Sequence, residues 1–357
     1  MPVSTTIAAP VSAAADGSDT AHGLRPVAIW LFGCCAMIFA MVVIGGITRL
    51  TWSGLSITEW QPVTGILPPL SDGAWAAEFE KYRQIPQYKL LNAGMSLVQF
   101  KTIYLWEYTH RLWGRLIGVV YLLPFLYFLV RRRLPRRLAW PLTGIFALGG
   151  AQGGLGWYMV ESGLADRIEV SQYRLTAHLV LALAIYAATL WIALELWRGR
   201  AQPGAPLLWR RASEGLIALV GLTISAGGFV AGLNAGLTYN TFPLMDGSFV
   251  PAGYAQLQPF FRNWFENVAA VQFDHRLMAM TTASAALAMW VLGWGAALPR
   301  AARIALHALL AAMAVQFALG VSTLLLVVPI PLAAAHQAGA VILLTAAIVW
   351  RHTLRAA

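Results

Sequence analysis

Charged residues are scarce in this chain of 357 residues: Asp, Glu, Lys and Arg together make up 11%, against about 25% in soluble domains. Hydrophobic residues make up 59%, which excludes a disordered chain. Cysteine is almost absent, and the two cysteines, Cys34 and Cys35, are neighbours that cannot bridge each other within one helix. That excludes a disulfide-rich scaffold. With a mean hydropathy of +0.64, the composition predicts an all-α polytopic membrane protein.

Long runs without charge predict eight transmembrane helices. The last charge-free run, 304–350, is too long for one helix and is divided at Pro329 and Pro331, because proline breaks the helical hydrogen-bond ladder. The polar segment 53–105 is expected to form short amphipathic helices on the outer face. The predicted spans are 26–48, 105–130, 138–160, 175–194, 213–232, 271–298 and the two parts of 304–350.

Arginine placement predicts the orientation of these spans, because basic residues accumulate in cytoplasmic connections. Both termini are expected to be cytoplasmic, and this accounts for the net charge of +10 without nucleic-acid binding. Residues 1–25 contain Asp16, Asp19 and a single arginine, whereas a mitochondrial transit peptide is rich in arginine and poor in acidic residues. They therefore predict a disordered cytoplasmic tail and a bacterial inner membrane location. The arginines of the basic connections are Arg131, Arg132, Arg133, Arg136, Arg137, Arg198, Arg200, Arg210, Arg211, Arg300, Arg303, Arg351 and Arg355.

The chain also repeats itself at roughly half its length, which predicts two pseudo-symmetric four-helix bundles. These are an N-terminal half, 26–197, and a C-terminal half, 212–357, joined by a basic cytoplasmic linker, 198–211. Four segments match in order, at offsets of 182, 165, 164 and 158 residues. The matched pairs are 45–48 with 227–230, 108–112 with 273–277, 151–156 with 315–320, and 176–178 with 334–336.

Four of the seven histidines lie in these repeats, near the outer ends of even-numbered spans: His110, His178, His275 and His336. Ionisable groups inside a span are costly and usually functional. Two imidazoles on facing helices can ligate a heme iron from both sides. The positions four residues on are all small, which leaves room for a flat macrocycle: Gly114, Ala182, Ala279 and Ala340. The alternative is four helix-packing hydrogen bonds; a zinc site is disfavoured by the spacing.

Charged neighbours distinguish the two halves. Arg111 and Arg276 each follow a repeated histidine and are candidates to bind heme propionates, or else to reach lipid phosphates. Glu107 precedes His110 by three residues, whereas the matching position in the second half is Gln272. Because only one half has this carboxylate, the chemistry is predicted to take place in that half. The carboxylate would accept protons or stabilise positive charge there. The alternative is an interface glutamate paired with an arginine. Asp274 is expected to cap the sixth span.

Taken together, these motifs resemble heme A synthase, from about residue 26 to the end. The motifs that carry the resemblance are 45–51 (GGITRLT), 53–56 (SGLS), 107–111 (EYTHR), 240–247 (NTFPLMDG), 274–276 (DHR) and 336–337 (HQ). Some bacterial members have a cysteine pair in the first outer loop, and its absence here resembles the proteobacterial and mitochondrial branch. The resemblance implies eight spans in two halves and oxidation of the C8 methyl of heme O to a formyl group.

The resemblance also implies the role of each candidate residue. His275 and His336 would ligate the iron of heme B, the cofactor; His110 and His178 would face the iron of the substrate heme O; Glu107 would be the essential carboxylate. An external electron acceptor is implied, and heme O synthase or a second copy of the chain are possible partners. Two alternatives stay open: a diheme b-type electron-transfer protein, and a non-catalytic heme-delivery or oxidase assembly factor.

Overall fold

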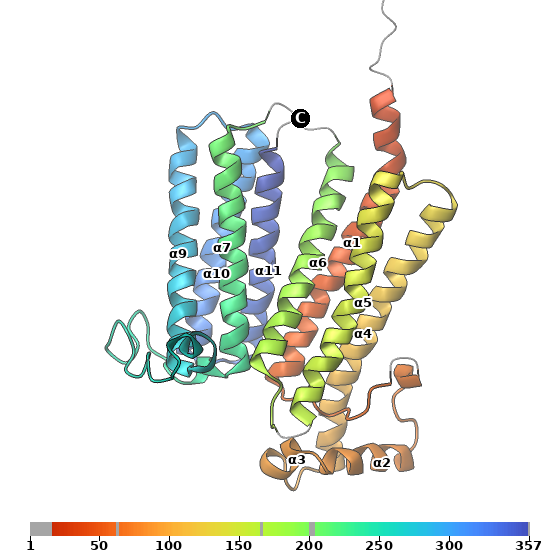
Figure 1. Cartoon of the computed structure of the whole chain (residues 1–357), viewed down its shortest axis with the longest axis vertical. Coiled ribbons are helices and arrows are strands. Elements are labelled where there is room, and N and C mark those ends of the chain that lie inside the picture. The colour runs from red at the N-terminus through yellow and green to blue at the C-terminus, as the bar shows by residue number, and fades with distance from the viewer. Residues whose placement is uncertain (1–15, 62–63, 165–166, 200–203, 356–357) are drawn as a thin grey trace, which may run out of the picture.

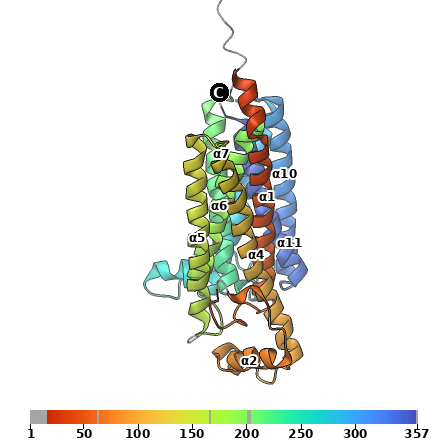
Figure 2. The same ribbon diagram turned by 90° about the vertical axis from the view of Figure 1, so that its right-hand side faces the viewer.

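The computed structural model describes residues 16–61, 64–164, 167–199 and 204–355. Within these ranges the chain is helical and contains no β-strand, only an isolated bridge between Met245 and Ser248. Eight long helices run side by side (Figures 1 and 2). They are α1 (Asp16–Leu50), α4 (Leu97–Val130), α5 (Arg136–Leu164), α6 (Gln172–Arg198), α7 (Leu207–Gly232), α9 (Val268–Trp294), α10 (Arg300–Leu325) and α11 (Ile330–Thr353).

Seven of these helices are long and apolar enough to cross a membrane, with mean hydropathies between 1.4 and 2.7 over their most apolar stretches. The prediction of an all-helical polytopic membrane protein is therefore confirmed. The eighth long helix, α5, is not among the seven; it contains seven glycines, which lower its hydropathy. It nevertheless packs along α6 and lies within the same bundle as the other seven (Figure 1).

The eight helices form two groups of four that lie side by side (Figure 1). One group is α1, α4, α5 and α6; the other is α7, α9, α10 and α11. The groups meet where α1 packs on α11 and where α6 packs on α7 and α11. Gln337 of α11 donates to the carbonyl of Val42 at 3.0 Å, and the hydroxyls of Tyr186 and Thr345 lie 2.7 Å apart. These polar contacts join helices that are distant in sequence.

The two ends of the bundle differ in character. At one end, called here the basic end, lie the C-terminal residues, the start of α1 and the arginine-rich connections (Figure 1). The opposite end, called the loop end, carries α2 (Asp72–Arg83), α3 (Pro86–Leu91) and the segment 233–267 with the short α8 (Asn263–Glu266) (Figures 1 and 2). The expected short helices of the polar segment 53–105 are therefore present. A small cluster of Leu55, Tyr82, Ile85, Phe100 and Tyr104 packs them against α4.

Most long helices begin earlier than the sequence predicts, and the difference is largest for α1, α4 and α7. The helix α4 starts at Leu97, eight residues before 105, because Ser96 and Gln99 form a capping box: Gln99 N donates to Ser96 Oγ at 3.3 Å, and Ser96 N donates to Gln99 Oε1 at 2.9 Å. The helix α7 starts at Leu207, directly after Pro206, so it includes the end of the expected linker 198–211.

The helix α1 starts at Asp16, within the expected disordered tail of residues 1–25. Adding residues to an existing helix costs little compared with nucleating one, so a spanning helix readily continues past the apolar run. The expected tail is thus helical from Asp16 onward, and residues 1–15 lie outside the described residues. Residues 200–203 of the expected linker lie outside them too.

The main hydrophobic core occupies the half of the bundle next to the basic end. It contains residues from every long helix, including the fully buried Leu31, Leu142, Leu309 and Trp350. None of the four repeated histidines belongs to it. The core therefore holds the helices together at the basic end, and the histidines lie beyond it, toward the loop end.

Candidate functional site

Each group of four helices contains one pair of the repeated histidines. His110 on α4 and His178 on α6 lie close enough for the charge on one ring to act on the other. The same holds for His275 on α9 and His336 on α11. Three of the four lie within the first two turns of their helix at the loop end, so both pairs have the same depth in the bundle.

A glycine on a neighbouring helix makes room for each imidazole ring. A Cβ atom built on Gly45 of α1 would lie 3.2 Å from His110 Nε2, and one on Gly156 of α5 would lie 3.0 Å from His178 Cε1. In the second group, a Cβ on Gly227 of α7 would lie 3.1 Å from His275 Cε1, and one on Gly320 of α10 would lie 2.8 Å from His336 Cε1. Most side chains at these positions would displace the rings.

These four glycines occupy matching positions in the internal repeat. Gly45 and Gly227 are 182 residues apart, and Gly156 and Gly320 are 164 apart, the offsets of the matched segments that contain them. The sequence shows the repeated glycines but not which side chains they face. The sequence analysis therefore did not predict that these glycines make room for the imidazoles, although their repetition was a signal for such a function.

Hydrogen bonds orient the second histidine of each pair through matched glutamines. Gln152 Nε2 donates to the backbone oxygen of His178 at 3.0 Å, and Gln316 Nε2 donates to that of His336 at 3.0 Å. The Gln316 amide also lies 3.1 Å from the Nδ1 atom of His336. Both halves thus fix the helix backbone at the second histidine in the same way.

The ring of His275 has a defined tautomer. Its Nδ1 atom lies 3.1 Å from the carbonyl oxygen of Thr223, and since a carbonyl only accepts, Nδ1 carries the proton. The lone pair is then on Nε2, which is the arrangement found in metal-ligating histidines that donate from Nδ1. In the first half the Nδ1 atom of His178 is buried and has no hydrogen-bond partner among the described residues.

The two histidine pairs fit the iron of a porphyrin better than they fit a bare metal ion. Among the described residues, no three His, Cys, Asp or Glu side chains come together as a metal-binding cluster. A porphyrin supplies four nitrogen ligands of its own, so two axial imidazoles complete the coordination of its iron. Two pairs of imidazoles, each cradled by two glycines, fit two such groups.

A substitution at Gly320 tests the cradle. Gly320→Ala places a methyl group 2.8 Å from His336 Cε1, so the ring must move, and we expect most of the bis-imidazole heme absorbance of the second half to be lost. Gly149→Ala on α5 is the matched control, because nothing lies within 4 Å of its added methyl group. Equal heme content in both variants, measured from absorbance spectra of the purified proteins, would show that Gly320 does not position His336.

Glu107 is buried and fully engaged by hydrogen bonds. It is 2% exposed. Its Oε2 atom accepts from Ser56 Oγ and from the Ile57 amide, both at 2.8 Å. Its Oε1 atom accepts from Arg111 Nε at 3.1 Å and from Arg111 Nη2 at 2.6 Å. The carboxylate therefore ties Arg111 and the loop after α1, which contains Ser56 and Ile57, to α4, one turn from His110.

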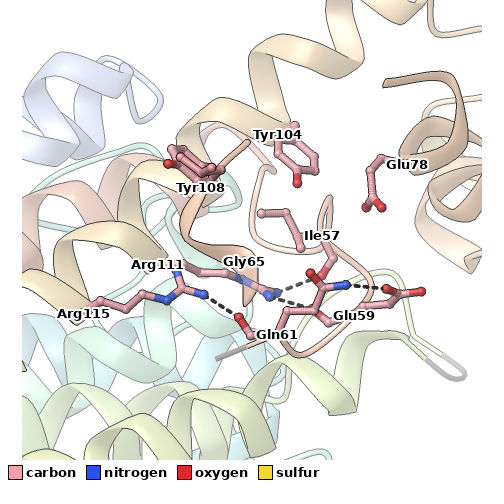
Figure 3. A pocket seen from close by; sticks show the side chains of 10 residues that line it. Ile57, Glu59, Gln61, Gly65, Glu78, Tyr104, Tyr108, Arg111 and Arg115 are labelled. Carbon is pink, nitrogen blue, oxygen red and sulfur yellow. Dashed lines mark hydrogen bonds between the residues drawn. The ribbon is translucent and has the colours of Figure 1, made fainter. Parts of the chain in front are cut away.

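Arg111 makes further contacts with the same loop. Its Nη1 atom donates to the carbonyl of Glu59 at 2.9 Å, and its Nη2 atom donates to that of Ile57 at 2.8 Å. Arg115, one turn further along α4, donates to the carbonyl of Gln61 at 2.7 Å. Figure 3 shows these side chains around a polar pocket that Tyr104, Tyr108 and Glu78 also line.

Glu59, which lines this pocket, also forms an ion pair with Lys81. The Lys81 ammonium lies 2.9 Å from Glu59 Oε1, and its hydrogen bond lowers the pKa of the Glu59 carboxyl. Glu59 therefore stays negatively charged as the pH falls toward the ordinary range of a glutamate. Since the Glu59 side chain is exposed at the surface, the contribution of this ion pair to stability is small.

The second half keeps the arginine contacts but not the carboxylate. Arg276 donates to the carbonyls of Tyr239 at 2.5 Å and Thr241 at 2.7 Å. These residues lie 182 positions after Ile57 and Glu59, the carbonyl partners of Arg111, so the two arginines hold matching points of the two outer loops. Gln272, in the place of Glu107, donates to the Tyr239 carbonyl at 3.3 Å. Both arginines thus donate to backbone carbonyls of loops at the loop end, a function that residue spacing alone did not reveal.

Asp274 does not cap its helix, contrary to the sequence prediction. The helix α9 starts at Val268 and is capped by Asn267, whose Oδ1 atom accepts from the amides of Ala269 and Ala270. Asp274 lies nearly two turns inside α9 and accepts a hydrogen bond from the Tyr254 hydroxyl at 2.9 Å. The prediction was wrong because the helix begins three residues before the first position, 271, that its apolar pattern indicated.

Known proteins resemble the chain over almost its whole length. A family model described as "Cytochrome oxidase assembly protein" matches residues 28–348. Heme A synthase of Nitrosospira multiformis is 56% identical over 93% of this chain and 94% of its own length. The chain belongs to the heme A synthase family.

Members of this family from other lineages are similar to a comparable extent. Heme A synthase of Rhodospirillum centenum is 53% identical over 97% of this chain and 92% of its own. Heme A synthase COX15 of Arabidopsis thaliana is 48% identical over 92% of this chain and 74% of its own. Bacterial and plant heme A synthases thus both match, as the motifs indicated.

Proposed function

We propose that this chain is a membrane oxidoreductase that oxidises the C8 methyl group of heme O to a formyl group and so forms heme A. Membership of the heme A synthase family supports the activity. The observation that carries the proposal is the duplication of one histidine pair in a glycine cradle, with a carboxylate beside only one copy. Two permanent, equivalent hemes would not need that difference.

The first half is proposed to bind the substrate. His110 and His178 face the iron of heme O, and two successive hydroxylations give a gem-diol that loses water to leave the aldehyde. In each hydroxylation a water molecule supplies the oxygen atom, and two electrons and two protons are released. An external electron acceptor takes up the electrons, and the protons pass to the solvent. The protein's contribution is to hold the ring so that its methyl group stays in one place.

The second half is proposed to bind heme B through His275 and His336. The defined tautomer of His275 and the cradles at Gly227 and Gly320 support this assignment. Heme B bound there supplies one-electron transfer. Arg276, with its Nε atom buried and without a partner among the described residues, is proposed to contact a heme propionate. Arg111 is proposed for the same role in the first half, although Glu107 and two carbonyls already engage it.

Glu107 is proposed to act through its charge. Both of its oxygens already accept hydrogen bonds, so taking up a proton would break at least one of them. A fixed negative charge one helical turn from His110 stabilises the positive charge that develops as the substrate is oxidised. The same carboxylate holds the first outer loop against the loop end of the first four helices through Ser56 and Ile57.

The membrane orientation is proposed from the two ends of the bundle. The arginine-rich connections gather at the basic end, which is proposed to face the cytoplasm together with both termini (Figure 1). The membrane is proposed to be the bacterial inner membrane. The loop end and both histidine pairs then lie near the outer surface. Heme O synthase and a second copy of the chain are proposed partners.

The activity can be tested with the purified full-length chain. Heme O and an artificial electron acceptor are added, and the extracted porphyrins are identified by mass. We expect heme A to appear in proportion to the acceptor that is reduced. Two unmodified b hemes and no conversion of heme O would instead identify a diheme electron-transfer protein.

A further inference from the structure

An arginine at the loop end joins the two halves of the molecule. Arg49 lies in the last turn of α1, in the first half. Its Nη2 atom donates to the carbonyl oxygen of Ala231 on α7 and to the Oδ1 atom of Asn234, both in the second half. One guanidinium thus connects the end of α1 to the end of α7.

This guanidinium lies between the two histidine pairs. Arg49 follows Gly45, the cradle of His110, by four residues, and its acceptor Ala231 follows Gly227, the cradle of His275, by four residues. Four residues correspond to about one helical turn, or about 6 Å along each axis. The positive charge is therefore one turn beyond a histidine of each pair, on the seam between the halves.

A carboxylate accompanies the arginine. Asn234 Nδ2 donates to Glu169 Oε1, in the connection between α5 and α6, and the charges of Arg49 and Glu169 interact. Asn234 has φ +50° and ψ +27°, a left-handed conformation that asparagine tolerates better than most residues. Its amide therefore lies between the two charged groups and contacts both.

The internal repeat has no second copy of this arginine. The offset of 182 that relates Gly45 to Gly227 places Ala231 at the position of Arg49. The alanine contributes only its backbone carbonyl, as the acceptor for Arg49. The end of α7 therefore folds without an arginine at the position that matches Arg49. The half-buried guanidinium of Arg49 thus occurs in one copy of the repeat only, which suggests a function for its charge.

We propose that Arg49 is a positioning residue that docks the two halves through Asn234 and places a positive charge beside both heme sites. This inference rests on the proposed function, because it requires a heme between His275 and His336. A partly buried charge is screened less than an exposed one, and nearby charge is one of the determinants of a heme reduction potential. Arg49 is expected to raise that potential, and Glu169 to lower it.

Removing the charge of Arg49 and removing the charge of Glu169 are expected to shift the heme midpoint potential in opposite directions. In the purified full-length protein, Arg49→Gln is expected to lower the midpoint potential of the bis-histidine heme, because a positive charge that favours the reduced state is lost. Glu169→Gln is expected to raise it. Arg49→Lys keeps the charge and is expected to remain closer to the wild type than Arg49→Gln. Redox titration followed by absorbance measures all three shifts.

A second arginine–carboxylate pair provides matched controls. Arg351 of α11 donates to Glu214 of α7 at 2.7 Å, and this ion pair is at the basic end, far from the four repeated histidines. Arg351→Gln and Glu214→Gln are expected to leave the potential unchanged. A purely structural role of Arg49 predicts shifts of the same sign for Arg49→Gln and Glu169→Gln, or none, and either result overturns the inference. A wild-type protein without any bis-histidine heme would instead overturn the proposed function.

Discussion

Glu107→Gln is expected to lower the rate of heme A formation by roughly 10²–10³-fold, a typical loss when a group that stabilises transition-state charge is removed. The amide keeps the size of the side chain and can still accept from Ser56 and Ile57, so the first outer loop stays attached. What is lost is the negative charge beside His110 and the ion pair with Arg111. The rate is measured as heme A formed from added heme O.

The heme content of this variant decides how the loss is interpreted. We expect both histidine pairs of Glu107→Gln to bind heme normally, because the carboxylate contacts neither pair through a hydrogen bond that the structure describes. Glu80→Gln, at an exposed ion pair with Arg83 on α2, is the control and should keep full activity. Full activity of Glu107→Gln would leave the residue with a structural role only.

His275→Ala is expected to abolish the bis-imidazole absorbance of heme B and, with it, the formation of heme A. If His275 and His336 ligate the iron as proposed, His336 alone would leave one protein ligand, which would change the spin state of the iron and weaken binding. The alanine also leaves space where Gly227 and the Thr223 carbonyl had enclosed the imidazole. The absorbance spectrum of the purified variant measures the first effect, and mass analysis of its porphyrins measures the second.

A histidine at the other end of the molecule is the control for this variant. His307 on α10 accepts a hydrogen bond from Trp290 at 2.8 Å near the basic end, and His307→Ala should leave both spectrum and activity unchanged. An unaltered heme B spectrum in His275→Ala would mean that a different residue ligates the iron.

Sequence patterns predicted the helices and the repeat because both depend on local signals. Long apolar runs mark membrane helices wherever they occur, and seven of the eight expected spans satisfy that test in the structure. Repeated motifs placed the four histidines in two pairs at similar depth, and the structure brings His110 to His178 and His275 to His336. The ligand roles themselves stay predictions.

Contacts between segments far apart in the chain could not be predicted from the sequence. Nothing in the order of residues indicated that Arg111 and Arg276 hold the backbone of the outer loops, because their partners lie 52 or more and 35 or more positions away. The same is true of Arg49 and Ala231, which are separated by 182 residues. Helix starts were also missed where a capping box, as at Ser96, outweighed the apolar pattern.

The pigment composition of a first-half double variant tests the central claim most directly, namely that the two histidine pairs hold different hemes. His110→Ala combined with His178→Ala is produced together with a source of heme O, and the porphyrins extracted from the purified protein are identified by mass. We expect heme B to be retained in full, while the heme O and heme A found with the unmodified chain disappear. Loss of heme B, or retention of heme O, in this variant would contradict the assignment of the two halves.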